Sequence, residues 1–109
     1  MKRMGWVIQV RPEMIAEYKR LHADVWPDVL AKIADCNIRN YTIYLREPEN
    51  LLFAHFEYHG TDFAADSARM AADPVTQEWW QHTDPCQQPM DSAPPGEQWS
   101  SLEEVFHCD

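Results

Sequence analysis

Apolar side chains recur every three or four residues between positions 14 and 33, which is the spacing of one face of an α-helix. Charged side chains at positions 13, 20, 24 and 28 fall on the opposite face. Pro27 lies inside this pattern, and proline removes a backbone donor and clashes with the preceding turn. We therefore expect a kink at Pro27 or a break at Trp26, with a second short helix continuing to about Ala34. The apolar face comprises Met14, Ile15, Tyr18, Leu21, His22, Val25, Trp26, Val29 and Ile33.

Shorter apolar runs on either side of this region predict strands. Residues 4–10, 38–45 and 51–58 are rich in β-branched and aromatic side chains, and residues 101–106 predict a closing strand. Residues 47–50 form the turn of a hairpin between the second and third of these strands. Within residues 38–45, strict alternation assigns Ile38, Asn40, Thr42 and Tyr44 to one face and Arg39, Tyr41, Ile43 and Leu45 to the other.

The remaining segments predict two helices and a long loop. Residues 63–72 are alanine-rich, and Asp73-Pro74 ends this helix and begins a short second one over residues 75–82. Four prolines between residues 83 and 98 oppose both helix and strand and predict a surface loop. The resulting order of elements is that of an α+β, ferredoxin-like βαββαβ fold with one antiparallel sheet and helices on one face. A single domain over residues 1–109 accommodates it.

The charge balance limits the classes of partner. Nine Lys and Arg residues against 18 Asp and Glu residues give a pI near 4.8, so we expect no binding to nucleic acid or to an anionic membrane surface. The N-terminal apolar run is too short for a signal peptide or a membrane span. Cys36, Cys86 and Cys108 are odd in number and widely spaced, which predicts free thiols and a cytoplasmic location.

Metal and nucleotide sites are not indicated. His55 and His59 have a four-residue spacing that suits ligands on a helix, but they lie in a segment predicted as a strand. Glycine-rich phosphate loops and nucleophile elbows are missing from the sequence. We therefore expect acid/base chemistry without a cofactor or a metal.

Tyr18 and His22 lie one helical turn apart in the middle of the apolar face. Each has two interpretations. His22 is either a structural core histidine or a group that exchanges protons near neutral pH, because the ordinary pKa of imidazole is about 6.5. Tyr18 is either a core aromatic or a hydrogen-bonding group for a hydroxylated ligand.

Trp79 and Trp80 are adjacent and therefore cannot both face the core from one helix. One interpretation has one ring anchored in the core while the other lines a cleft; the alternative makes both core or dimer-interface anchors. If the helices cover the sheet, Tyr18 and His22 point toward it and Tyr41 points back. Aromatic walls with uncharged hydrogen-bonding groups suit a sugar.

These residues are also those that resemble a known family, the L-rhamnose mutarotases. The resemblance runs from residue 4 to residue 109 and rests on segments 17–22, 26–27, 40–45, 50–54, 79–80 and 103–106, in that order. It implies a ferredoxin-like chain that dimerises through its sheet as an α/β-barrel type assembly. It also implies an isomerase that interconverts α and β anomers through the open-chain sugar, with no cofactor. His22 matches the family's proton donor, and its sugar-binding positions match Tyr18, Tyr41, Trp79 and Trp80.

The segment 85–99 departs from the family pattern because it is longer, which leaves open another sugar such as L-fucose. Two functions from other classes also suit a ferredoxin-like dimer: a cofactor-free oxygenase for polycyclic aromatic compounds, and a sugar-binding module without activity. A homodimer is expected in every case, because a single sheet with helices on one face leaves its other face bare. Trp6, Ile8, Phe53 and Val105 belong either to that bare face or to the core.

Overall fold

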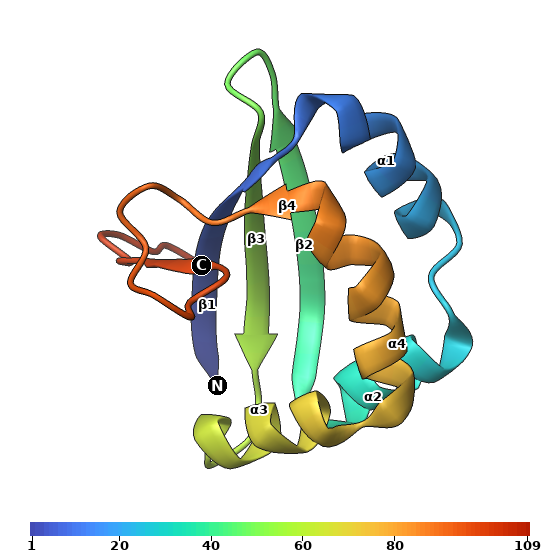
Figure 1. The fold of residues 1–109 in the computed structure, drawn as a ribbon. Helices are drawn as coiled ribbons and strands as arrows, with labels where there is room; N and C mark the ends of the chain where they lie inside the picture. The colour runs from blue at the N-terminus through green and yellow to red at the C-terminus, as the bar shows by residue number, and fades with distance from the viewer.

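The computed structural model describes all residues from Met1 to Asp109 and contains one five-stranded antiparallel sheet with four helices. The strand order is β2-β3-β1-β4, with β5 also paired to β1, which confirms the ferredoxin-like arrangement. Figure 1 shows α1, α2 and α4 beside one face of the curled sheet, with α3 crossing beneath its end. The elements are β1 Lys2–Val10, η1 Pro12–Met14, α1 Ile15–Ala23, α2 Pro27–Asp35, β2 Ile38–Arg46, β3 Leu51–Tyr58, α3 Phe63–Ala72, α4 Pro74–Thr83, η2 Asp84–Cys86, β4 Gln87–Gln88 and β5 Ser100–Leu102.

A proline begins α2, which follows α1, and another begins α4, which follows α3, as the sequence predicts. Pro27 is the first residue of α2, and the preceding Trp26 is extended at φ −60° and ψ 133°, because a residue before proline is pushed out of the helical region. Pro74 likewise begins α4, where the Asp73 side chain accepts a hydrogen bond from the Thr76 backbone N–H at 3.0 Å. None of the helices is long and apolar enough to cross a bilayer.

Strand β2 contains a bulge that the alternation pattern does not predict. Residues Asn40 and Tyr41 together oppose Phe56 of β3, because Arg39 pairs with Glu57 and Thr42 pairs with His55. Asn40 has a φ of 52°, in the left-handed region that asparagine tolerates better than most residues. The bulge changes the phase of the strand. Ile38 before it and Ile43 and Leu45 after it all face the helices, so the predicted division of this strand into two faces is wrong.

The closing strand also differs from the prediction. The edge strand next to β1 is β4, which pairs with Gln9 and Val10 of β1. Strand β4 lies within the segment predicted to be a loop. Strand β5 pairs with Gly5 to Val7 farther along the same edge and ends at Leu102. Val105 and Phe106 lie beyond this strand and are 89 % and 81 % exposed, so the predicted extension of the strand to residue 106 is wrong.

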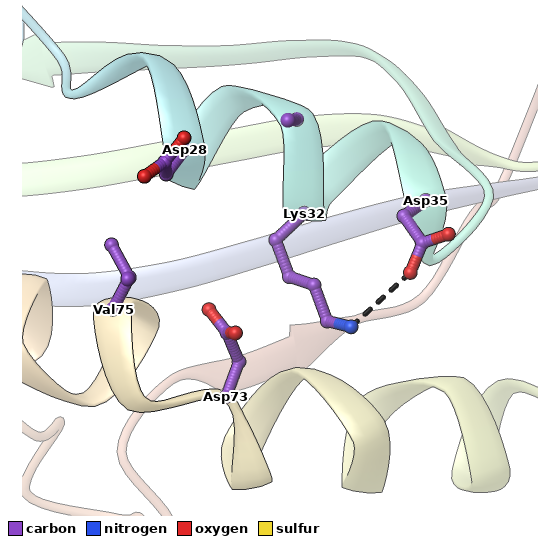
Figure 2. Close-up of a pocket in the computed structure, with 6 residues that line it drawn as sticks. Asp28, Lys32, Asp35, Asp73 and Val75 are labelled. Atoms are coloured by element: carbon purple, nitrogen blue, oxygen red, sulfur yellow. Dashed lines mark hydrogen bonds and ion pairs between the residues drawn. The ribbon is translucent and has the colours of Figure 1, made fainter.

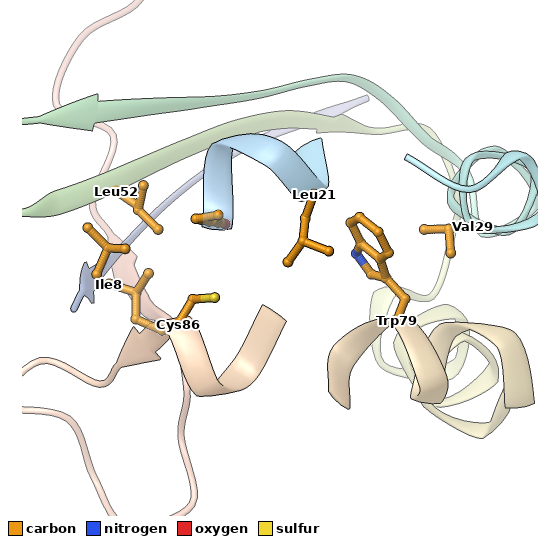
Figure 3. Packing of buried hydrophobic residues seen from close by; sticks show 8 residues of the cluster. Ile8, Leu21, Val29, Leu52, Trp79 and Cys86 are labelled. Carbon is orange, nitrogen blue, oxygen red and sulfur yellow. The ribbon is translucent and has the colours of Figure 1, made fainter. Parts of the chain in front are cut away.

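The core lies between the sheet and the helices. The core contains two clusters of buried residues. Figure 3 shows the larger one, in which Trp79 of α4 lies between Leu21 of α1 and Val29 of α2. Ile8 belongs to this cluster, and Trp6 packs against a smaller one around Phe56. The members of the larger cluster are Ile8, Val10, Tyr18, Leu21, Val29, Leu52, Trp79 and Cys86.

Phe53 lies on the other face of β3, since its neighbours Leu52 and Ala54 are buried under the helices. It pairs with Val7 of β1 and Tyr44 of β2, so these three residues form a row across the sheet face that carries no helix. Tyr44 is 63 % exposed. The structure thus leaves an apolar row on the face opposite the helices.

Candidate active site

A cavity of about 1050 Å³ lies between the helices and the sheet. Of its 33 lining residues, 21 are hydrophobic, so the wall is mostly apolar with a limited set of polar groups. The five residues singled out from the sequence all line it: Tyr18, His22, Tyr41, Trp79 and Trp80. Elements far apart in the chain, α1, β2 and α4, therefore bring the candidate residues to one site.

The imidazole of His22 is held in one tautomer by its own helix. Its Nδ1 lies 2.8 Å from the backbone carbonyl oxygen of Tyr18, one turn earlier in α1. A carbonyl oxygen only accepts hydrogen bonds, so Nδ1 carries the proton and donates it. Burial lowers the pKa of His22 below its ordinary value, and the hydrogen bond to Tyr18 opposes this effect only in part. At neutral pH the ring is therefore uncharged, and Nε2 keeps a free lone pair.

Tyr18 is 6 % exposed, and its hydroxyl oxygen accepts a hydrogen bond from Nε2 of Gln87 at 3.1 Å. Its ring lies 4.2 Å from the His22 ring in an edge-to-face arrangement. Burial raises the pKa of the phenol, and the hydrogen bond from Gln87 opposes this effect only in part. Tyr18 consequently stays protonated near neutral pH, and its O–H is a hydrogen-bond donor.

Tyr41 enters the cavity from the sheet, immediately after the left-handed residue Asn40. Its ring lies 5.5 Å from that of Phe56. The residue is 37 % exposed, yet desolvation of its hydroxyl raises the pKa of the phenol to about 12. Tyr41 thus provides a second uncharged hydroxyl on the wall opposite α1.

The two tryptophans differ in burial, as one of the two interpretations expects. Trp79 is 6 % exposed and packs edge-to-face against Trp26 at 5.3 Å and His22 at 5.5 Å. Trp80 is only half-buried and packs against the edge of the same cluster. Both rings line the cavity, so Trp79 combines a core position with a place in the cavity wall.

Several residues of the cavity wall carry no signal in the sequence that marks them as candidates. Gln87 comes from the segment predicted to be a surface loop, residues 83–98, and Trp99 follows that segment directly; no periodic pattern there indicates a buried side chain. Lys19 and Asp84 add charges to the cavity lining, and desolvation raises the pKa of the Asp84 carboxyl. Composition alone indicated that the segment could not continue a helix; it carried no signal for which of its side chains turn inward.

A second, smaller pocket of about 330 Å³ lies between α2 and the start of α4 and has a different character. Figure 2 shows Asp28, Lys32, Asp35, Asp73 and Val75 around it, with the Lys32 ammonium paired to Asp35 at 3.2 Å. The lining contains no aromatic ring. Because its cation is already paired and no flat apolar wall is present, this pocket does not suit a sugar.

Comparison with known proteins gives a consistent family. Residues 3–108 match the family model described as L-rhamnose mutarotase. The L-rhamnose mutarotase of Oceanobacillus iheyensis is 30 % identical over 109 residues, which is 100 % of both chains. That of Shigella flexneri is 35 % identical over 108 residues, or 98 % of each chain.

Two solved structures share the fold across the whole of both chains. They are the L-rhamnose mutarotase of Formosa agariphila, with a TM-score of 0.79 at 23 % identity, and the tetracenomycin F2 cyclase of Streptomyces glaucescens, with a TM-score of 0.70 at 13 % identity. At these identities the two structures support the fold alone. The family model and the curated relatives carry the assignment: the chain belongs to the L-rhamnose mutarotase family.

Proposed function

We propose that this protein interconverts the α and β anomers of L-rhamnose, with His22 as the group that moves the proton. The observation that carries the proposal is the fixed tautomer of His22, which leaves Nε2 as a base inside a cavity lined by aromatic rings and hydroxyls. Family membership supports the sugar and the reaction class.

In the proposed reaction, Nε2 of His22 takes the proton of the anomeric hydroxyl. The bond between C1 and the ring oxygen breaks, C1 becomes the aldehyde carbon, and the imidazolium returns the same proton to the former ring oxygen. Rotation about the C1–C2 bond and the reverse steps on the other carbonyl face give the second anomer. His22 is thus base and then proton donor, and it ends each half-reaction uncharged.

Tyr18 and Tyr41 are proposed to bind sugar hydroxyls, and Trp79 and Trp80 to pack against the apolar face of the ring. Their uncharged state supports a neutral sugar, since neither phenol ionises near pH 7. General acid/base help of about 10²- to 10⁴-fold together with positioning is sufficient for a reaction that also proceeds slowly in water.

The competing substrate is another 6-deoxy sugar such as L-fucose. The observation in its favour is Trp99, which lines the cavity from the end of the proline-rich segment 85–99. Exchange NMR on equilibrated L-rhamnose, L-fucose and neutral hexoses separates the two hypotheses. The sugar whose anomers exchange fastest above the buffer control is the substrate, and a full panel at control rates would exclude mutarotase activity.

We also propose a homodimer formed by the sheet face that carries no helix. The row of Val7, Phe53 and Tyr44 on that face supports it. Val7 is 8 % exposed, but Phe53 is only half-buried and Tyr44 is exposed in the single chain, and apolar sheet surface left open is a liability in an isolated monomer. A cytoplasmic location is supported by free thiols at Cys36, Cys86 and Cys108. Fractionation of the producing cells tests the location, and recovery outside the cytoplasm would contradict it.

A further inference from the structure

Gln87 is a buried amide whose hydrogen bonding within the chain is incomplete. It is 6 % exposed, and its Nε2 donates to the Tyr18 hydroxyl at 3.1 Å. Its Oε1 forms no hydrogen bond within the chain. The only fully enclosed side-chain oxygen or nitrogen without a partner is Ser100 Oγ, so Gln87 Oε1 remains accessible. Because Gln87 lines the large cavity, its carbonyl oxygen is open to a ligand there.

The hydrogen bond from Gln87 also fixes what Tyr18 offers. A phenol has one proton to donate, and here its oxygen already accepts the amide N–H, while no acceptor within the chain takes its proton. The two side chains therefore present a donor, the Tyr18 O–H, beside an acceptor, the Gln87 carbonyl. Two adjacent sugar hydroxyls complement this pair, since one can accept from the phenol while its neighbour donates to the amide.

We propose that Gln87 is a substrate-binding residue that, together with Tyr18, recognises two neighbouring hydroxyls of the sugar. The inference rests on the proposed function for the identity of the ligand class, and it adds a specificity-determining residue from β4. The Gln87 carbonyl oxygen is accessible from the cavity and has no partner within the chain, so a sugar hydroxyl can donate to it. Gln88 offers the contrast within the same strand, because it is exposed and accepts only a surface hydrogen bond from Arg11.

The first experiment uses the unmodified protein. Affinities for the parent sugar and for each of its monodeoxy derivatives are measured by tryptophan fluorescence, for which Trp79 and Trp80 are the reporters. We expect removal of either of two adjacent hydroxyls to weaken binding about tenfold or more, because each removal leaves a buried polar group unpaired. A derivative series in which no adjacent pair of positions matters would overturn the proposal.

The second experiment assigns the pair with Gln87→Met and Tyr18→Phe, with Gln88→Met as the matched control. Methionine has a similar volume and no polar group, so Gln87→Met should bind the parent sugar about tenfold more weakly and become insensitive to removal of one of the two hydroxyls. Tyr18→Phe should become insensitive to the other, and Gln88→Met should keep the original pattern. If Gln87→Met keeps that pattern, Gln87 only ties β4 to α1 and the proposal is wrong.

Exchange rates at saturating sugar separate this proposal from the proposed function. Gln88→Met should exchange sugar at the original rate, because its side chain does not line the cavity. In Gln87→Met the weaker affinity should appear as a higher sugar concentration for half-maximal exchange, and loss of exchange with unchanged affinity would overturn the role in binding. If the unmodified protein binds sugar but does not accelerate anomer exchange, the proposed mutarotase activity is wrong. The affinities for the monodeoxy sugars would still decide whether Gln87 binds the sugar. If Gln87→Met does not fold, the derivative series and Tyr18→Phe still decide the matter.

Discussion

Asn40 and Tyr41 together lie opposite a single residue of the neighbouring strand, Phe56. The left-handed conformation of Asn40, at φ 52°, absorbs the extra residue, and Tyr41 then joins the side chains that face the helices. Without the bulge, Tyr41 and Ile38 would fall on opposite faces of β2. The position of the sheet-side hydroxyl in the cavity therefore depends on the backbone of the preceding residue.

Replacement of Asn40 tests this dependence. Valine strongly disfavours the left-handed region, so Asn40→Val should lower the free energy of unfolding by about 1–2 kcal/mol and weaken sugar binding as Tyr41 is displaced. Glycine adopts the same conformation without strain, so Asn40→Gly should keep the affinity. Denaturant unfolding and sugar titration of both variants provide the measurement. Equal sugar affinities in the two variants would show that the bulge does not position Tyr41.

His22→Asn tests the chemistry. Asparagine still forms hydrogen bonds but does not exchange a proton near pH 7. The variant should fold, bind sugar within about tenfold, or about 1.4 kcal/mol, and lose about 10²- to 10⁴-fold in exchange rate. Thermal melting, sugar affinity and exchange NMR on one preparation give the result. A lower melting temperature with an unchanged rate per folded molecule would instead identify His22 as a structural histidine.

The rate should also depend on pH in a defined direction. Burial lowers the pKa of His22 below 6.5. At a pH above this lowered pKa the His22 ring is uncharged, and Nε2 accepts the anomeric proton. As the pH falls through the pKa, His22 becomes protonated and no longer acts as a base, so the exchange rate should fall with a midpoint below pH 6.5. Exchange NMR from about pH 8 to pH 5, corrected for buffer catalysis, measures the profile. A rate that rises toward acid would mean that the imidazolium begins the reaction.

The sequence predicted the helical side of the site more completely than the sheet side. Tyr18 and His22 follow from helical periodicity, because an apolar stripe identifies inward-facing residues without knowledge of their partners. The apolar stripe also continues past the break at Pro27, since Val29 of α2 and Leu21 of α1 belong to the same core cluster, with Trp79 between them. Tyr41 was selected correctly for the cavity, but the alternation that assigned its strand faces was wrong at Asn40.

The missing part is β4 and Gln87, and its cause is physical. Strand β4 has two residues, which is too short for a period of two to appear in the sequence. It is held by tertiary contacts instead: its pairing with Gln9 and Val10, and the hydrogen bond from Gln9 Nε2 to the Pro89 carbonyl at 2.8 Å. Such contacts join residues about eighty positions apart, so local propensity does not report them.

The proposed dimer is tested at Phe53, the central residue of the apolar row on the open sheet face. Val7 and Tyr44 flank it on the adjacent strands, so lysine at this position places a charge where a second sheet would pack. Phe53→Lys should raise the dimer dissociation constant at least about tenfold, whereas lysine at the exposed helical position Ala68, on the opposite side of the sheet, should not. Sedimentation at micromolar concentration should give twice the chain mass of 12.8 kDa for the original protein and for Ala68→Lys, and a shift toward the chain mass for Phe53→Lys. A stable monomer in the original protein would remove the dimer, and a dimer indifferent to Phe53→Lys would move the interface away from this face.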